Sequence, residues 1–173
     1  MTRHWGRSLL LRSFLSLLLP KKTTAPVRWV NRDLAIGCPE DESDWLALRA
    51  RGVRGVVDLS AEPGDLGPRV RQQGMRYLRL AVADGHLPEV EELHIVTSWV
   101  LQRVREEGPV LIHECGGRAN HALLATAALI KRGASLSRAS GQLRHASPAR
   151  FSDAQLDLLE RFAGELARVT SRR

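Results

Sequence analysis

The run VLIHECGGRANHALLATAALI, residues 110–130, does most to limit what this chain can fold into. It begins with a short apolar stretch, passes through two glycines and ends in a long, mostly apolar segment. An uninterrupted apolar strand is typical of a sheet covered on both faces, and parallel sheets are covered in this way. The run therefore predicts a central strand, a glycine turn and a helix that packs against the sheet.

The chain from Val27 onward alternates between strand and helix patterns. Strands are expected in VRWV, LAIG, VRGVVDLS, MRYLRLAV and PVLIH. Helices are expected in EDESDWLALRARG, in DLGPRVRQQG, from about Pro88 to the end of RVREEG, and over 118–132, 136–144 and 152–169. This order predicts one α/β domain over residues 26–173, with a mostly parallel central sheet flanked by helices. Ligands of such domains bind at the carboxyl ends of the strands, where 113–120 are expected.

Residues 1–25 form a separate segment that is leucine-rich, basic and free of acidic residues. On a helical wheel, its leucines and Phe14 share one face, whereas Arg12 and several serines lie opposite. Such a helix suits contact with a membrane surface, through residues 1–19, or an organellar presequence. Its apolar run of about 12 residues is too short to span a bilayer.

Two other states remain open for this segment, namely packing against the domain and a disordered start. We expect an intracellular protein that is attached to a membrane surface or targeted to an organelle, the alternative being a cytoplasmic one. The formal net charge is +7, but the chain has no basic stripe with interleaved aromatic residues, so no nucleic-acid partner is expected.

The two cysteines, Cys38 and Cys115, lie far apart in the sequence and form no CxxC pair. We therefore expect no disulfide framework and a reducing compartment. The histidines and cysteines show no ligand spacing, so neither a metal site nor a cofactor is expected.

The glycine turn after the apolar strand poses a contradiction. Turns of this kind hold phosphate because free backbone N–H groups gather at the helix start. Yet Glu114 follows the strand directly, and its carboxylate repels the anion that the turn is suited to hold.

Between Val27 and Phe162 the chain contains an ordered series of fragments: RDLAIGCPEDESDWLALRARGVRGVVDLSAE, YLRLAVADGHLP, PVLIHE…GG…ALLATAALIKRG, GQLRHASP and DAQLDLLERF. In this series the chain resembles the dual-specificity branch of the protein tyrosine phosphatases. This resemblance implies that family's α/β fold and a general acid at Asp84. It also implies an anion loop made of His113, Glu114, Cys115, Gly116, Gly117, Arg118, Ala119, Asn120 and His121.

Members of that family use a cysteine directly after the histidine, then five residues, then an arginine followed by serine or threonine. The thiolate attacks phosphorus and the arginine binds two phosphate oxygens. By position, the cysteine place holds Glu114, the arginine place Asn120 and the hydroxyl place His121. With three chemical residues replaced, the resemblance implies a pseudophosphatase that binds a protein partner or a phosphorylated ligand.

The alternative is an active phosphatase or related phosphate-ester hydrolase with unconventional residues, such as Cys115, or Glu114 with Asp84. Three roles are open for Glu114: its carboxylate accepts the N–H bonds that phosphate would take, it pairs with Arg118 or points to solvent, or it acts as a base. Cys115 is expected to be a thiol that lines the loop. Asp84 either keeps an acid's role or only shapes its own loop.

Overall fold

The strand that the sequence places at the centre of the sheet, β5 (Val110–His113), does lie there. The structure is a computed structural model that describes residues 26–61, 64–83, 85–115, 120–147 and 150–171. The other strands are β1 (Arg28–Trp29), β2 (Leu34–Gly37), β3 (Gly55–Asp58) and β4 (Arg76–Arg79). Their spatial order is β1-β2-β5-β3-β4, and only the β1–β2 pair is antiparallel. The expected mostly parallel sheet is confirmed.

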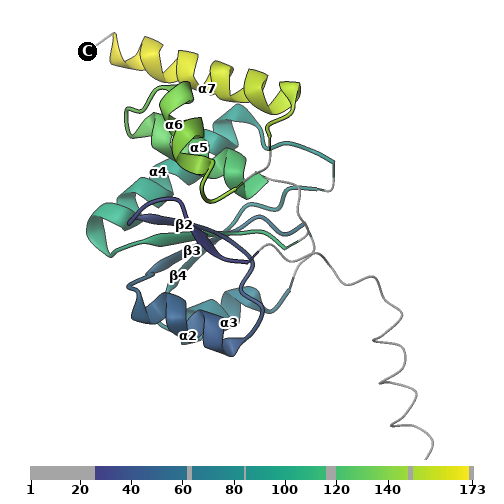
Figure 1. The fold of residues 1–173 in the computed structure, drawn as a ribbon, viewed down its shortest axis with the longest axis vertical. Coiled ribbons are helices and arrows are strands. Elements are labelled where there is room, and N and C mark those ends of the chain that lie inside the picture. Colours follow the sequence, from purple (N-terminus) through teal and green to yellow (C-terminus); the bar gives the residue numbers. More distant parts are fainter. Residues whose placement is uncertain (1–25, 62–63, 84, 116–119, 148–149, 172–173) are drawn as a thin grey trace, which may run out of the picture.

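Helices cover both faces of this sheet (Figure 1). One layer holds α2 (Glu42–Ala50) and α3 (Leu66–Gln72). The opposite layer holds α4 (Val90–Glu106), α5 (Asn120–Lys131), α6 (Leu136–Leu143) and α7 (Asp153–Thr170). The predicted helices therefore exist, and the ends that lie within the described residues differ from the prediction by at most two residues.

The core is divided between the two faces of the sheet by the alternation of side chains along each strand. In β5, Leu111 packs in a cluster with Trp45 of α2 and Val70 of α3. Its neighbours Val110 and Ile112 point the other way, into the larger cluster under α4 to α7. Both faces of β5 are thus buried, which explains why its sequence is apolar without interruption.

Helix α5 is buried along its described length, from residue 120 to residue 130. It packs against the sheet and against α4, α6 and α7, so every side of the helix meets protein. Because its first two residues, Asn120 and His121, are also the last two of the anion loop, this helix fixes where the loop ends. The 118–119 start of the expected helix lies outside the described residues.

Residues 1–25, for which the sequence predicts an amphipathic helix, also lie outside the described part of the chain. Within the described residues, no helix combines the length and the apolar character needed to cross a bilayer.

Truncation of Phe162 is expected to destabilise the fold strongly. Phe162 belongs to α7 and its side chain is fully buried. Its ring centroid lies 4.5 Å from that of His94 on α4. Phe162→Ala should lower the free energy of unfolding by about 3–5 kcal/mol, because it leaves a cavity between the two helices. Val169→Ala is the control on the same helix, since Val169 is 59% exposed and its loss should change stability by less than about 0.5 kcal/mol. Urea unfolding measures both, and equal losses would contradict the packing described.

Candidate functional site

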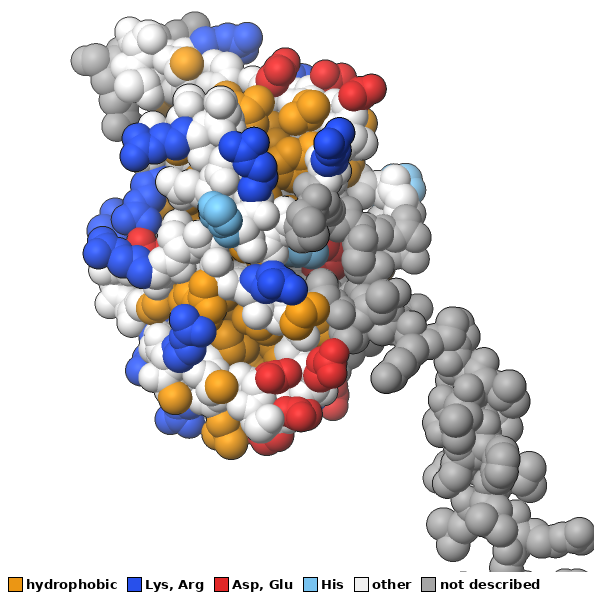
Figure 2. Space-filling view, viewed as in Figure 1, with side chains coloured by type: hydrophobic (Ala, Val, Ile, Leu, Met, Phe, Trp, Pro, Cys, Tyr) orange, Lys and Arg blue, Asp and Glu red, His pale blue; other side chains and the backbone are white. Residues whose placement is uncertain are grey.

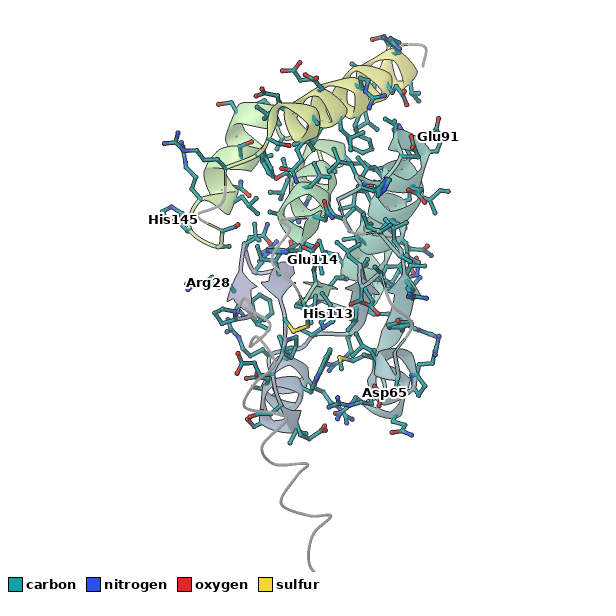
Figure 3. All side chains as sticks on the ribbon, turned by 90° about the vertical axis from the view of Figure 1, so that its right-hand side faces the viewer. Arg28, Asp65, Glu91, His113, Glu114 and His145 are labelled. Atoms are coloured by element: carbon teal, nitrogen blue, oxygen red, sulfur yellow. A yellow bond between two sulfur atoms is a disulfide. The ribbon has the colours of Figure 1, made fainter. Side chains whose placement is uncertain are left out.

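The carboxyl ends of the three central strands meet in register, and the candidate site is built on them. Gly37 of β2 and Asp58 of β3 both pair with His113 of β5. The ladder continues for one more bond, because the backbone N–H of Glu114 donates to the Gly37 carbonyl at 3.3 Å. Residues that are far apart in the sequence are thus held side by side at the carboxyl ends of these strands. Figure 3 labels two of the site residues, His113 and Glu114.

Glu114 turns into the protein instead of toward solvent, and only 6% of it is exposed. Its Oε2 accepts a hydrogen bond from the backbone N–H of His121, near the start of α5, at 3.1 Å. The same oxygen lies 2.7 Å from Nδ1 of the His121 ring, which donates because a carboxylate can only accept. The carboxylate therefore accepts one N–H at the helix start, in line with the first of the three roles considered for Glu114. The loop residues 116–119 lie outside the described part of the chain.

Asn120 is the first residue of α5 and is 4% exposed. Within the described part of the chain, its side-chain Oδ1 has no hydrogen-bond partner. An amide here cannot supply the two parallel charge-assisted bonds that a guanidinium gives to phosphate. Residues 116–119, which include Arg118, and the candidate acid Asp84 lie outside the described residues.

Cys38 and Cys115 form a disulfide, which corrects the expectation of two unpaired cysteines. Cys38 follows β2 directly and Cys115 follows β5 by two residues, so the parallel pairing of these strands brings their Cα atoms to 5.2 Å. The 77-residue separation in the sequence hides this proximity. Cys115 is therefore not a free loop thiol in this structure, and the expectation of a reducing compartment loses the support that it drew from unpaired cysteines.

A hydrogen-bonded chain of side chains leads away from the disulfide. His113 Nε2 lies 3.2 Å from Cys115 Sγ, and its Nδ1 lies 3.1 Å from Asp58 Oδ1. The other carboxylate oxygen of Asp58 accepts from the Tyr77 hydroxyl at 2.7 Å, and Ser60 N–H donates to Oδ1 at 3.0 Å.

These contacts shift the pKa values of Asp58 and Tyr77. Burial alone would raise the pKa of Asp58, but the hydrogen bonds that its carboxylate accepts outweigh burial and hold the pKa well below its ordinary value. Burial, followed by the bond to Asp58, raises the pKa of Tyr77 to about 12. Asp58 is thus a buried anion whose lone pairs are directed at His113, Tyr77 and a backbone N–H.

Sequence reasoning missed Cys38, Asp58 and Tyr77 as members of this site. The one available signal was Asp58 at the end of the apolar strand GVVD, since an acid at the carboxyl end of a buried parallel strand often lies at a binding edge. Nothing in the sequence alone indicates that Cys38 meets Cys115 or that Tyr77 reaches across to Asp58.

Tyr77 is the only tyrosine in the chain, so its titration can be read without interference from another phenol. We expect tyrosinate absorbance to develop around pH 12 instead of near the ordinary 10.0. In Asp58→Asn the pKa should fall but stay above 10.0, because burial remains. Since the folded-state pKa is raised, the stability contributed by this contact is present below pH 10.0 and lost as pH rises toward 12. A phenol that titrates near 10.0 while circular dichroism shows a folded chain would contradict the contact.

No family model matches this chain, and no curated protein is similar to it in sequence. Solved structures do match. The crystal structure of Tk-PTP in the active form is 28% identical with a TM-score of 0.68, covering 80% of this chain and 96% of that one. Human DUSP28 is 26% identical with a TM-score of 0.69, covering 83% and 99%. PTPMT1 is 20% identical with a TM-score of 0.75, covering 86% and 100%.

Proposed function

We propose that this chain, which has the fold of the dual-specificity phosphatases, is a catalytically inactive member of that group that acts as a binding module for a protein or an anion near a membrane. The observation that carries the proposal is the buried Glu114 carboxylate at the start of α5. It stands at the position that matches the family's nucleophilic cysteine, and it accepts a backbone N–H at the helix start, where it would compete with an incoming anion.

Two features of the site, together with the general cost of losing a nucleophile, support the absence of turnover. Attack on a phosphate monoester by Glu114 would have to proceed without an arginine clamp, because the matching position holds the buried amide of Asn120. The sulfur of the neighbouring Cys115 is bonded to the sulfur of Cys38. It is therefore not a thiolate and cannot act as a nucleophile. Loss of the covalent nucleophile alone costs a hydrolase on the order of 10⁶ in turnover.

A basic hollow supports the binding part of the proposal. It has a volume of about 700 Å³ and is lined by three arginines and His145, against a single acid, Asp33. It lies between the β1–β2 turn and the carboxyl-terminal end of α5, so it is at the opposite end of the sheet from Glu114. Lys and Arg side chains are also spread over the face shown in Figure 2, most densely on its left. Such a surface suits an acidic or phosphorylated partner. Contact with a membrane is proposed through residues 1–19.

The test is hydrolysis of a chromogenic aryl phosphate by the reduced native chain, compared with Cys115→Ser and Glu114→Gln at equal concentration. We expect all three rates to equal that of buffer. Activity that disappears in Glu114→Gln would make the carboxylate a catalyst and refute the proposal.

The chain of contacts from Asp58 through His113 to Cys115 favours a second candidate, an unconventional phosphate-ester hydrolase. A histidine oriented by a carboxylate and facing a sulfur is the arrangement that activates a thiol nucleophile. This candidate requires the disulfide to be reduced. It would be supported if activity of the reduced chain disappeared in Cys115→Ser but persisted in Glu114→Gln.

A further inference from the structure

Three side chains with metal-binding atoms converge at the carboxyl ends of β2 and β5. The Sγ atoms of Cys38 and Cys115 and a ring nitrogen of His113 all lie within 4.8 Å of one another. Cys38 and His113 are buried, and Cys115 is partly exposed. Figure 3 shows the sulfur–sulfur bond close to His113.

The hydrogen bonds of His113 determine which of its nitrogens is available. Asp58 can only accept, so Nδ1 carries the proton and donates it to Oδ1. The carboxylate is itself fixed by the Tyr77 hydroxyl. In the neutral ring, Nε2 therefore presents its lone pair, and it lies 3.2 Å from Cys115 Sγ. Because Cys115 Sγ is part of a disulfide, it has no proton and cannot donate a hydrogen bond to the Nε2 lone pair.

A carboxylate that fixes one nitrogen of a histidine while the other faces two sulfurs is the arrangement that orients metal-bound histidines. We infer that, when the disulfide is reduced, the chain binds Zn²⁺ through Cys38 Sγ, Cys115 Sγ and His113 Nε2. Two thiolates and one imidazole suit Zn²⁺, whereas Mg²⁺ and Ca²⁺ prefer oxygen ligands. This inference does not depend on whether the domain hydrolyses phosphate.

Zinc binding requires two steps, reduction of the disulfide and then deprotonation of the two thiols. A dithiol reductant gives two electrons and two protons to the Cys38–Cys115 bond and becomes a disulfide itself, leaving two thiols. Binding of Zn²⁺ then releases both thiol protons to solvent, and His113 contributes its lone pair. Two thiolates neutralise the two charges of the ion, so the ion and its two sulfur ligands together carry no net charge.

The backbone already holds the ligands at suitable positions. In a tetrahedral site with Zn–S near 2.3 Å, the two sulfurs stand about 3.8 Å apart, so the sulfurs must separate once their bond is broken. The Cα atoms of Cys38 and Cys115 lie 5.2 Å apart, just beyond the end of the β2–β5 ladder. Rotation about the Cα–Cβ bonds can move the two sulfurs to the separation that Zn²⁺ needs. Three protein ligands leave a fourth position for water, reached from the exposed side of Cys115.

The experiment uses the full chain, reduced with a phosphine, freed of reductant without oxygen, incubated with Zn²⁺ or Co²⁺ and passed through a desalting column. We expect about one zinc per reduced chain and a thiolate-to-cobalt charge-transfer band with Co²⁺. The oxidised chain should bind none, because its sulfurs are occupied. Since the chain has two cysteines in all, a thiolate band in the native protein identifies them as ligands without any substitution.

Variants then test the histidine and its support. His113→Asn should lose stoichiometric zinc, and Asp58→Asn should weaken zinc binding about 10–100-fold. His86→Asn is the matched control, since His86 is exposed and lies outside the cluster, and should bind zinc as the native chain does. Failure of the reduced native chain to retain zinc, equal binding by the oxidised chain, or unchanged zinc affinity in a folded His113→Asn would each overturn the inference.

Discussion

Replacement of Glu114 by Cys together with Asn120 by Arg is expected to give a chain that hydrolyses a chromogenic aryl phosphate, whereas the native chain is expected to leave it intact. The first change restores the thiolate at the start of α5, where a helix N-terminus favours the ionised form. The second restores the bidentate cation. Because loss of a nucleophile costs on the order of 10⁶ in turnover, recovery of even part of it should raise the rate at least about a thousandfold over the native chain.

The single variants are the controls for this gain. Glu114→Cys alone should show far less activity, since phosphate has no arginine to hold it, and Asn120→Arg alone should show none. The assay needs a dithiol reductant, because Cys38 and Cys115 lie close to the new thiol. A native rate equal to that of the double variant, or a folded double variant no faster than buffer, would contradict the view that only the reacting residues have been lost.

Reduction of the Cys38–Cys115 bond is expected to lower the stability of the fold strongly without any substitution. A cross-link that closes a loop of this length restricts the unfolded chain by about 4.5 kcal/mol in the chain-entropy model, and removal of native disulfides costs about 2–5 kcal/mol. For a domain of this size the midpoint of thermal unfolding should fall by roughly 10 °C.

Thermal unfolding with and without a phosphine measures this fall in the midpoint. A chelator is present so that no metal restores stability to the reduced chain. The variant with both Cys38→Ala and Cys115→Ala should unfold at the lower temperature and ignore the reductant. An unchanged midpoint in a native chain that mass spectrometry shows to be fully reduced would contradict a stabilising bond.

The sheet could be predicted from the sequence because its pattern is local. The uninterrupted apolar run of β5 and the apolar positions of α4 and α5 report burial directly, and they indicated the layers that the structure contains. The inward turn of Glu114 was one of three roles that the sequence left open, and its physical ground is that a helix start attracts an anion.

The remaining part of the site depends on contacts between distant segments, which a single sequence does not encode in any local pattern. Cys38 reaches Cys115 only because β2 and β5 are parallel neighbours in one register. Tyr77 reaches Asp58 only because β4 lies beside β3. Spacing rules such as CxxC look along the chain and so miss pairs that form across a sheet.

The backbone amide of His121 offers the most direct measurement of whether Glu114 fills the anion site. In the native chain its N–H donates to Glu114 Oε2, so we expect a strongly downfield amide proton resonance that does not move when inorganic phosphate is added. In Glu114→Ala the resonance should shift upfield, because the acceptor is gone, and should then respond to phosphate. A native His121 amide that shifts with phosphate as much as the variant's does would contradict the account, because the site would then be open to an external anion.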